Sequence, residues 1–196
     1  MNIGFLASHR GSNMQAVVDA AASGGLPVKA AVLVCNNRNA EVVARVQSQG
    51  IPCFVLNSTT HPDAKALDQA MLAALQGHQC DVIVLAGFMK KIGPRVLGTF
   101  RGRIINIHPS LLPRHGGQGM YGRHVHQAVL DAHETVTGVT IHLVNDEYDK
   151  GRVLAQCEVP VMPNDTVETL AERVLMREHS FLVETVAAIV GGKIRL

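Results

Sequence analysis

The feature that most constrains the fold is the alternation of short apolar runs with amphipathic segments over the first hundred residues. Strand-like runs occur at residues 3–7, 28–35, 53–56, 82–86 and 103–108. Helical patterns, with apolar residues three and four apart, lie between them at residues 14–21, 40–49, 62–76 and 94–100. Strands that alternate with helices predict a parallel sheet built from right-handed βαβ units. The run at 82–86 is apolar throughout, as in a strand covered on both faces.

The second half of the chain has a different pattern. Residues 114–123 contain four glycines and predict a loop, and a short helix is expected at 125–131. The β-rich segments 137–144 and 153–159 are expected to pair, and a long final helix is predicted to begin at a capping pair of Asp165 and Glu168 and to end at Gly191. The fold class is therefore α/β: an open, mostly parallel twisted sheet with flanking helices, Rossmann-like, with antiparallel strands and a long helix in its C-terminal part. We expect one domain, 1–196, with halves 1–100 and 101–196.

Composition narrows the class of function. The chain has 196 residues, 47% of them hydrophobic, and a net charge of +2. Its Lys and Arg residues are scattered, whereas a nucleic-acid binder concentrates them in a stripe, so an anionic small molecule is the expected partner. The four cysteines form no CxxC pair, which predicts reduced core thiols. Neither a signal peptide nor a membrane span is evident, and we expect a cytoplasmic location without membrane or nucleic-acid partners.

The stretch from Asn106 to Pro113 is the most informative for chemistry. Asn106 and His108 are two apart on a predicted strand and so share a face, about 6.6 Å apart along the chain. Pro109 forces His108 into an extended conformation, at the strand end where open α/β sheets bind ligands. An amide and an imidazole placed this way can flank one reacting group. The alternative is a polar strand end at which His108 caps a turn.

Other polar positions leave two interpretations open. The glycine of Ser8-His-Arg-Gly11-Ser12-Asn13 would let a phosphate approach a helix start, but ordinary N-capping by Ser12 or Asn13 also explains these residues. Glu178 falls on the apolar stripe of the final helix, so it is either a paired buried carboxylate or a residue at the edge of the stripe.

Two further polar stretches have simple structural explanations. The acidic segment 146–151 suits a solvated turn. The two histidines of His124-Val-His126 lack a nearby third ligand, so polar surface is favoured over a metal site.

Taken together, the motifs resemble one family. Gly11-Ser12-Asn13, Leu85-Ala-Gly-Phe-Met89, Asn106-Ile-His-Pro-Ser-Leu-Leu-Pro113, Gly138-Val-Thr-Ile-His142 and Asp149-x-Gly151 occur in the order seen in folate-dependent formyltransferases. The similarity covers essentially the whole chain, and it is greatest to the single-domain branch that acts on 5-phosphoribosylglycinamide. The resemblance implies transfer of the formyl group of 10-formyltetrahydrofolate to the amine of that substrate, in de novo purine biosynthesis.

The resemblance also implies roles for particular residues. Asn106, His108 and Asp149 match the catalytic trio, with no metal. The substrate-binding positions are Gly11, Ser12, Asn13, Gly87 and Glu178. The folate-binding positions are Lys65, Met89, Lys90, Lys91, Ile92, Asn106, Val144, Asn145 and Asp146. The first half would then bind phosphate, and the second half would hold the catalytic and folate sites.

The chain departs from the commoner family pattern in two places. Its connection from Arg114 to His126 is longer and rich in glycine, and Leu175 stands where a polar partner of the substrate is expected. Two rivals of the transferase remain. One is a formyltetrahydrofolate deformylase, which uses water in place of the amine but normally carries an extra N-terminal domain. The other is a non-catalytic module that binds folate or a phosphate ligand.

The resemblance suggests a mechanism in which the uncharged amine attacks the formyl carbon. The Asn106 amide and a protonated His108 are expected to stabilise the negative oxygen that forms. Asp149 would favour the protonated imidazole and help to remove the amine proton. The oligomeric state is not indicated by the sequence.

Overall fold

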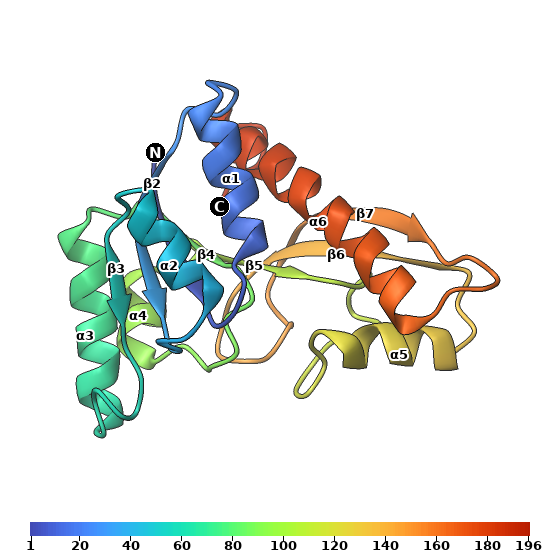
Figure 1. The fold of residues 1–196 in the computed structure, drawn as a ribbon, viewed down its shortest axis with the longest axis horizontal. Helices are drawn as coiled ribbons and strands as arrows, with labels where there is room; N and C mark the ends of the chain where they lie inside the picture. The colour runs from blue at the N-terminus through green and yellow to red at the C-terminus, as the bar shows by residue number, and fades with distance from the viewer. The chain divides into compact units, whose positions relative to one another are not determined.

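The computed structural model describes residues 1–196 and confirms the predicted α/β fold class. Seven strands form one mixed sheet in the order β3-β2-β1-β4-β5-β6-β7 (Figure 1). The elements are β1 Asn2–Ala7, α1 Ser12–Ala22, β2 Lys29–Cys35, α2 Glu41–Ser48, β3 Cys53–Val55, α3 Ala64–Gly77, β4 Val82–Leu85, α4 Pro94–Thr99, β5 Ile104–His108, α5 Arg123–Asp131, β6 Val136–Leu143, β7 Val153–Pro160 and α6 Val167–Val190. Strands β1 to β4 pair in parallel, and β6 pairs with β7 in antiparallel fashion.

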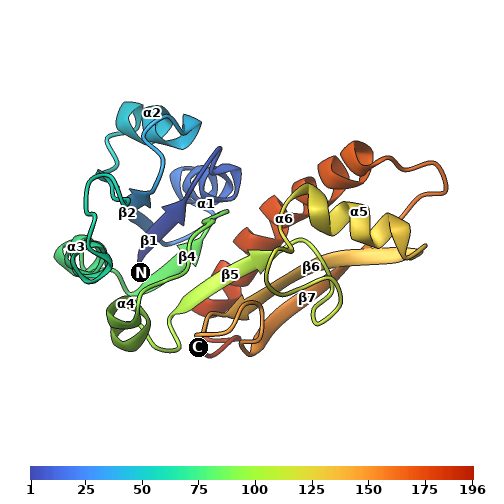
Figure 2. The same cartoon turned by 90° about the horizontal axis from the view of Figure 1, so that it is seen from below.

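The chain divides into two compact units, Met1–Ile105 and Asn106–Leu196. In the first unit, α1 and α2 cover one face of the strands and α3 and α4 the other (Figure 2). Central side chains such as Ile3, Phe5, Leu33 and Ile83 are completely buried. Strands covered on both faces need apolar residues at every position, which explains why the sequence of this half reads as unbroken apolar runs.

Two close contacts fix the helices of the first unit. A side chain at Gly4 would come within 2.7 Å of Leu75, so α3 packs tightly against β1 only because this position is glycine. The buried carboxylate of Asp68 on α3 accepts hydrogen bonds from the main-chain N–H of Arg95 (2.8 Å) and Val96 (3.2 Å). Since the first N–H groups of a helix have no partner within it, Asp68 caps α4 from a neighbouring helix and anchors the segment that joins β4 to α4.

In the second unit, α6 packs across β6 and β7, and α5 packs against α6 (Figure 2). The buried side chains Val139 and Ile141 of β6 face a core to which Leu170 and Leu182 of α6 also contribute. The β6–β7 ladder has a register shift between Ile141 and His142. A bulge of this kind bends a strand and redirects a side chain, and here it lies at the end of β6 that leads to the loop carrying Asp149.

The start of the final helix differs from its prediction, because Asp165 and Glu168 do not form the capping pair. Thr166 is the N-cap, and its hydroxyl and that of Thr169 form a reciprocal capping box. Asp165 instead makes two short bonds to the guanidinium of Arg173, at 2.6 and 2.7 Å. A bidentate charge-assisted pair is stronger than a single capping bond to a neutral N–H, so the carboxylate is used there. The predicted end of the helix at Gly191 is confirmed.

All four cysteines are free thiols, and Cys35 and Cys80 are buried as predicted, whereas Cys53 and Cys157 are only half-buried. Burial raises the pKa of Cys53 and of Cys80 to about 11, so these thiols stay protonated and act as packing groups. None of the helices combines the length and the apolar character needed to cross a bilayer.

Candidate active site

The end of β5 presents the two predicted polar side chains. Ile105 and Ile107 are buried, Asn106 is half-buried, and His108 is only 3% exposed. The chain that follows β5 is held by Thr140 of β6, whose hydroxyl donates to the carbonyl of Ser110 (2.6 Å). The position of His108 is therefore fixed by the strand before it and by a hydrogen-bonded turn after it.

A third side chain, His142 of β6, joins this pair and was not predicted as a site residue. Its Nε2 lies 3.1 Å from the Nδ2 of Asn106 and 3.4 Å from Oδ1 of Asp149. Its Nδ1 lies 2.9 Å from the carbonyl oxygen of Leu143. A carbonyl can only accept, so Nδ1 carries a hydrogen. Nε2 of His142 therefore accepts a hydrogen bond from the Asn106 amide and lies beside the carboxylate of Asp149.

Asp149 lies in the loop between β6 and β7, with a φ of +55°. Its Oδ2 accepts a hydrogen bond from the main-chain N–H of Gly117 (2.9 Å) and lies 3.6 Å from Nδ1 of His108. Burial would raise the pKa of Asp149, but the neighbouring imidazoles of His142 and His108 and the hydrogen bond from the Gly117 N–H outweigh it and lower that pKa. Asp149 is thus a carboxylate at neutral pH.

The pKa of His108 is lowered, chiefly by burial. The carboxylate of Asp149 and the carbonyl of His115, which lies 2.9 Å from Nε2 of His108, act in the opposite direction and raise it. The imidazole of His108 therefore favours its neutral form at neutral pH. The mechanism suggested by the family resemblance uses the protonated form instead. Nε2 bonds to the His115 carbonyl, which can only accept, so Nε2 carries the single hydrogen of the neutral ring. Nδ1, which faces Asp149, then has no hydrogen.

Two glycines of the motifs are required by close packing around this cluster. A side chain at Gly151 would collide with the carbonyl of Leu143, and one at Gly138 would collide with the carbonyl of Cys157. The pattern Asp149-x-Gly151 is therefore explained by the tight return of the loop past the end of β6.

In the first unit, Gly11 begins α1. Its φ is +60°, and an added side chain would collide with Val42 of α2. Ser12 is the first helical residue, and no side chain caps the helix, so the interpretation of this segment as N-capping by Ser12 or Asn13 is wrong. The first turn of α1 contains no acidic residue. A helix start whose N-cap is a glycine and whose first turn carries no acidic residue suits an anion.

Ser8, at the end of β1, connects the two loops that were predicted to bind ligands in this unit. Its N–H donates to the carbonyl of Gly87 (3.2 Å), and its hydroxyl accepts from the N–H of Met89 (2.8 Å). Sequence reasoning did not single out Ser8, although its place at the end of a buried strand was a usable signal. Met89 is exposed, whereas Ile92 is buried.

The remaining predicted residues occupy these positions. Lys65 is exposed in the first turn of α3, and Lys90 and Lys91 are exposed between β4 and α4. Val144, Asn145 and Asp146 follow β6 in the loop that carries Asp149. Glu178 is 8% exposed, on the buried side of α6, and is not at the edge of the stripe. The structure thus brings Asn106, His108 and Asp149 together, and their roles stay a prediction.

The histidine pair of α5 differs from its prediction. His124 is exposed, as expected for polar surface, but His126 is 5% exposed and its Nδ1 is buried without a hydrogen-bond partner. The i, i+2 spacing on a helix places the two side chains on different faces, which explains why only one is at the surface. No group of three or more His, Cys, Asp or Glu side chains is arranged to hold a metal ion.

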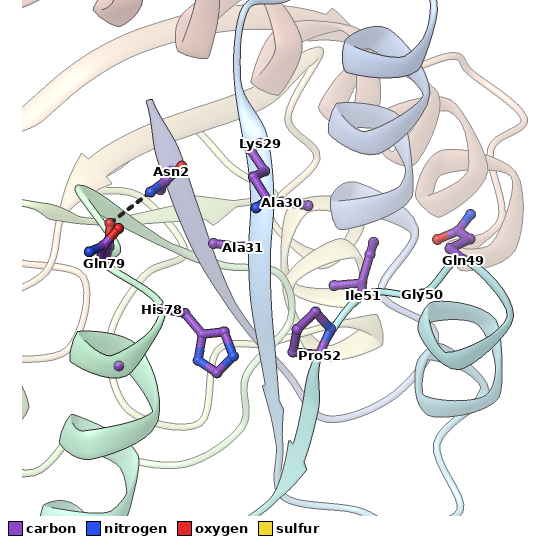
Figure 3. A pocket seen from close by; sticks show the side chains of 11 residues that line it. Asn2, Lys29, Ala30, Ala31, Gln49, Gly50, Ile51, Pro52, His78 and Gln79 are labelled. Atoms are coloured by element: carbon purple, nitrogen blue, oxygen red, sulfur yellow. Dashed lines mark hydrogen bonds between the residues drawn. The ribbon is translucent and has the colours of Figure 1, made fainter.

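A separate hollow of about 550 Å³ lies in the first unit, near the amino-terminal ends of β1 and β2 (Figure 3). Asn2 and Lys29 line it with the chain after α2 and after α3, and the amide of Asn2 donates to the carbonyl of Gln79. Ligands of open α/β sheets bind at the carboxyl ends of the strands. None of the predicted site residues lines this hollow.

The fold, with amide, imidazole and carboxylate side chains gathered at the end of a strand, is typical of an α/β enzyme. The chain belongs to the formyl transferase family, whose model matches residues 1–186. It is 40% identical to the chloroplastic phosphoribosylglycinamide formyltransferase of Arabidopsis thaliana over 94% of this chain and 64% of that protein. It is 34% identical to the phosphoribosylglycinamide formyltransferase of Haemophilus influenzae over 99% of this chain and 89% of that protein.

Solved structures agree with this assignment. Glycinamide ribonucleotide transformylase 1 of Geobacillus kaustophilus is 38% identical, with a TM-score of 0.89 over 97% of this chain and 98% of that one. A formyltetrahydrofolate deformylase of Pseudomonas syringae has a TM-score of 0.88 over all of this chain and 63% of that one, but at 22% identity it shows the fold alone. The family predicted from the motifs is thereby confirmed. The chain spans about two thirds or less of the length of the two chloroplastic relatives, 64% and 57%.

Proposed function

We propose that the protein transfers the formyl group of 10-formyltetrahydrofolate to the amine of 5-phosphoribosylglycinamide, as a step of de novo purine biosynthesis in the cytoplasm. The observation that carries this proposal is the cluster of Asn106, His108 and Asp149, in which Asp149 lies 3.6 Å from His108 and His142 lies between Asp149 and the Asn106 amide. It occurs in a chain whose bacterial relative with that enzyme name is 34% identical over nearly its whole length.

The cluster supports an addition–elimination reaction. The amine nitrogen bonds to the formyl carbon, and the carbonyl oxygen becomes negative. The Asn106 amide and Nδ1 of His108 stabilise that oxygen, and losing one such donor typically costs ~10²–10³ in turnover. The bond from carbon to the folate nitrogen then breaks, a proton passes to that nitrogen, and the new amide and tetrahydrofolate leave.

Proton transfer during the reaction explains how His108, whose pKa is lowered, can stabilise the negative oxygen. A negative oxygen near Nδ1 favours the imidazolium, as a carboxylate does, so the proton that the amine loses passes by way of Asp149 to Nδ1 of His108, and His108 then gives it to the leaving folate nitrogen. The distance of 3.6 Å between Nδ1 and Asp149 exceeds a hydrogen bond, so a reacting group can bond to both. Asp149 is the nearby base that accepts the proton lost by the amine, directly or through water.

Binding is assigned to the loops at the ends of the strands. Gly11, Ser12 and Asn13 hold the phosphate at the start of α1, and main-chain groups at Gly87 and the carboxylate of Glu178 contact the glycinamide and ribose part. Folate contacts come from Met89 to Ile92, from Lys65 and from the loop of Val144 to Asp146. The first half of the domain then serves the phosphate, and the second half serves folate and catalysis.

The direct test mixes the purified protein with 10-formyltetrahydrofolate, with and without 5-phosphoribosylglycinamide, and follows the release of tetrahydrofolate. Release that requires the ribonucleotide supports the transferase. Release without it would assign the deformylase reaction instead. Binding of both ligands with no release would identify a binding module and refute the proposed enzyme.

A further inference from the structure

The glycine-rich loop after β5 contacts both members of the catalytic pair through its main chain. The carbonyl oxygen of His115 lies 2.9 Å from Nε2 of His108, and the N–H of Gly117 donates to Asp149 at 2.9 Å. Gly116, between them, must be small, because a side chain there would press on Leu112 and approach Asp149 to 3.4 Å. One short turn therefore bonds to Nε2 of His108 and also to Asp149, the carboxylate that faces Nδ1 on the other side of the ring.

The backbone of this turn has an unfavourable conformation, which side-chain contacts must stabilise. His115 has a φ of +53° and is half-buried. Residues other than glycine adopt that left-handed conformation only where the surroundings enforce it, and such residues cluster at functional sites. The carbonyl that meets His108 belongs to this strained residue, so whatever holds His115 also directs the hydrogen bond.

Glu134 is the side chain that holds it. It lies between α5 and β6, and its Oε2 accepts from the guanidinium of Arg114 at 2.8 Å. Its Oε1 lies 3.4 Å from Nε2 of His115. The Arg114 side chain is half exposed, so the charge of this pair contributes little by itself. The effect of Glu134 is on geometry, because its one carboxylate fixes two successive residues of the turn.

We propose that Glu134 is a positioning residue for the reaction: by holding Arg114 and His115, it directs the His115 carbonyl at Nε2 of His108. The hydrogen on Nε2 then stays there, and Nδ1 becomes the nitrogen that gains and loses the proton at the reacting group. This role rests on the proposed function, since it assigns His108 to proton transfer.

The effect has a defined direction. The hydrogen bond to the His115 carbonyl raises the pKa of His108, so loss of the bond lowers that pKa. The other titratable groups around His108 are Asp149, His142, the ring of His115, and His126 on α5. Of these groups, the ring of His115 loses its contact with Glu134 in a Glu134 variant, whereas Asp149, His142 and His126 are unchanged. Because the carbonyl hydrogen bond is lost, the limb of the pH profile that belongs to His108 should move to lower pH, whether activity needs its neutral or its charged form.

The first experiment measures kcat and KM from acid to alkaline pH for Glu134→Ala and Glu134→Gln, with Asp131→Asn as the matched control. Asp131 is an exposed carboxylate at the end of α5. We expect kcat of Glu134→Ala to fall about tenfold, part of the ~10²–10⁴ that a positioned acid–base group contributes, while KM for either substrate changes less than twofold. Glu134→Gln keeps the size of the side chain and should show a smaller shift of the same sign. A purely structural role would scale kcat equally at every pH.

The second experiment does not depend on activity. Nitrogen-15 spectra of the histidine rings, assigned with His108→Asn, report which ring nitrogen of His108 carries hydrogen. We expect the Nε2–H form in the wild type and a mixture of both forms in Glu134→Ala. An unchanged ring and an unshifted pH profile in a folded Glu134→Ala variant would overturn the proposal. Absence of formyl transfer by the wild type would instead refute the proposed function, and the ring spectra would still decide the role of Glu134.

Discussion

Replacing Asp149 by Asn tests the catalytic cluster most directly, because it removes a charge and preserves the shape of the side chain. The carboxylate lies 3.6 Å from Nδ1 of His108, and its own hydrogen bond from Gly117 can still form to an amide oxygen. The loop should keep its conformation in this variant. The change is therefore confined to the electrostatics of His108 and to the loss of a base.

The magnitude follows from the distance. At 3.6 Å, two unit charges interact by about 4 to 5 kcal/mol at an effective dielectric constant of roughly 20. Asp149 is 12% exposed at its side chain, so water reduces this value, and about half of it is a reasonable lower bound. An interaction of about 2 to 4 kcal/mol that matters mainly when His108 is charged corresponds to a fall in kcat of about 30-fold to 10³-fold.

The assay is steady-state formyl transfer at saturating concentrations of both substrates, repeated over a range of pH. We expect kcat to fall by that factor while both KM values change little, since the lost interaction matters in the transition state more than in the bound complex. The carboxylate raises the pKa of His108, so the limb of the profile that belongs to His108 should move to lower pH. A kcat within threefold of the wild type in a folded variant would refute the catalytic role of Asp149, and Asp131→Asn should leave the profile unchanged.

Two further predictions concern stability and substrate binding. Burial lowers the pKa of His126 to about 4 in the folded protein, below its usual value of 6.5, so its contribution to stability is complete above pH 6.5 and is lost as the pH falls toward 4. His126→Leu should therefore reduce the loss of unfolding free energy between pH 7 and pH 4.5 by about 2 to 3 kcal/mol in urea titrations, and an equal loss in both proteins would contradict this. Gly11→Ala forces a side chain into the left-handed region and against Val42. It should lower the unfolding free energy by about 1–3 kcal/mol and raise KM for the ribonucleotide but not for the folate, so equal changes in both KM values would contradict the assignment of this loop to phosphate.

The sequence predicted the elements that depend on periodicity. Buried parallel strands require apolar residues at every position, so β1, β2 and β4 were evident as unbroken runs. The alternation along β5 placed Asn106 and His108 on one face, and both reach the same cluster in the structure. Glu178 was predicted at a buried position of α6 by counting helical turns, and it is 8% exposed.

Structural features that depend on competition between interaction partners, or on packing, were harder to predict from the sequence. Asp165 had the residue type and the spacing of a helix cap, but Arg173, two turns along the helix, binds it more strongly. His126 resembled a surface histidine because residues near it in sequence are polar, whereas it lies on the buried face of α5, opposite the exposed His124. In both cases the outcome depends on groups that lie beyond the few neighbouring residues that a local sequence pattern covers.

The glycine-rich loop shows a more general reason for the limit. The groups that it brings to His108 and Asp149 are a carbonyl and an N–H of the main chain, and every residue type carries these groups. The side-chain signals of the segment, an arginine and a histidine before two glycines, indicate a loop and say nothing about the direction of a carbonyl. Glu134 reveals that direction, because a single carboxylate bonded to two successive residues leaves the turn between them little freedom. The residues that hold a catalytic side chain through the backbone can therefore be recognised only once the structure shows which carbonyl is held.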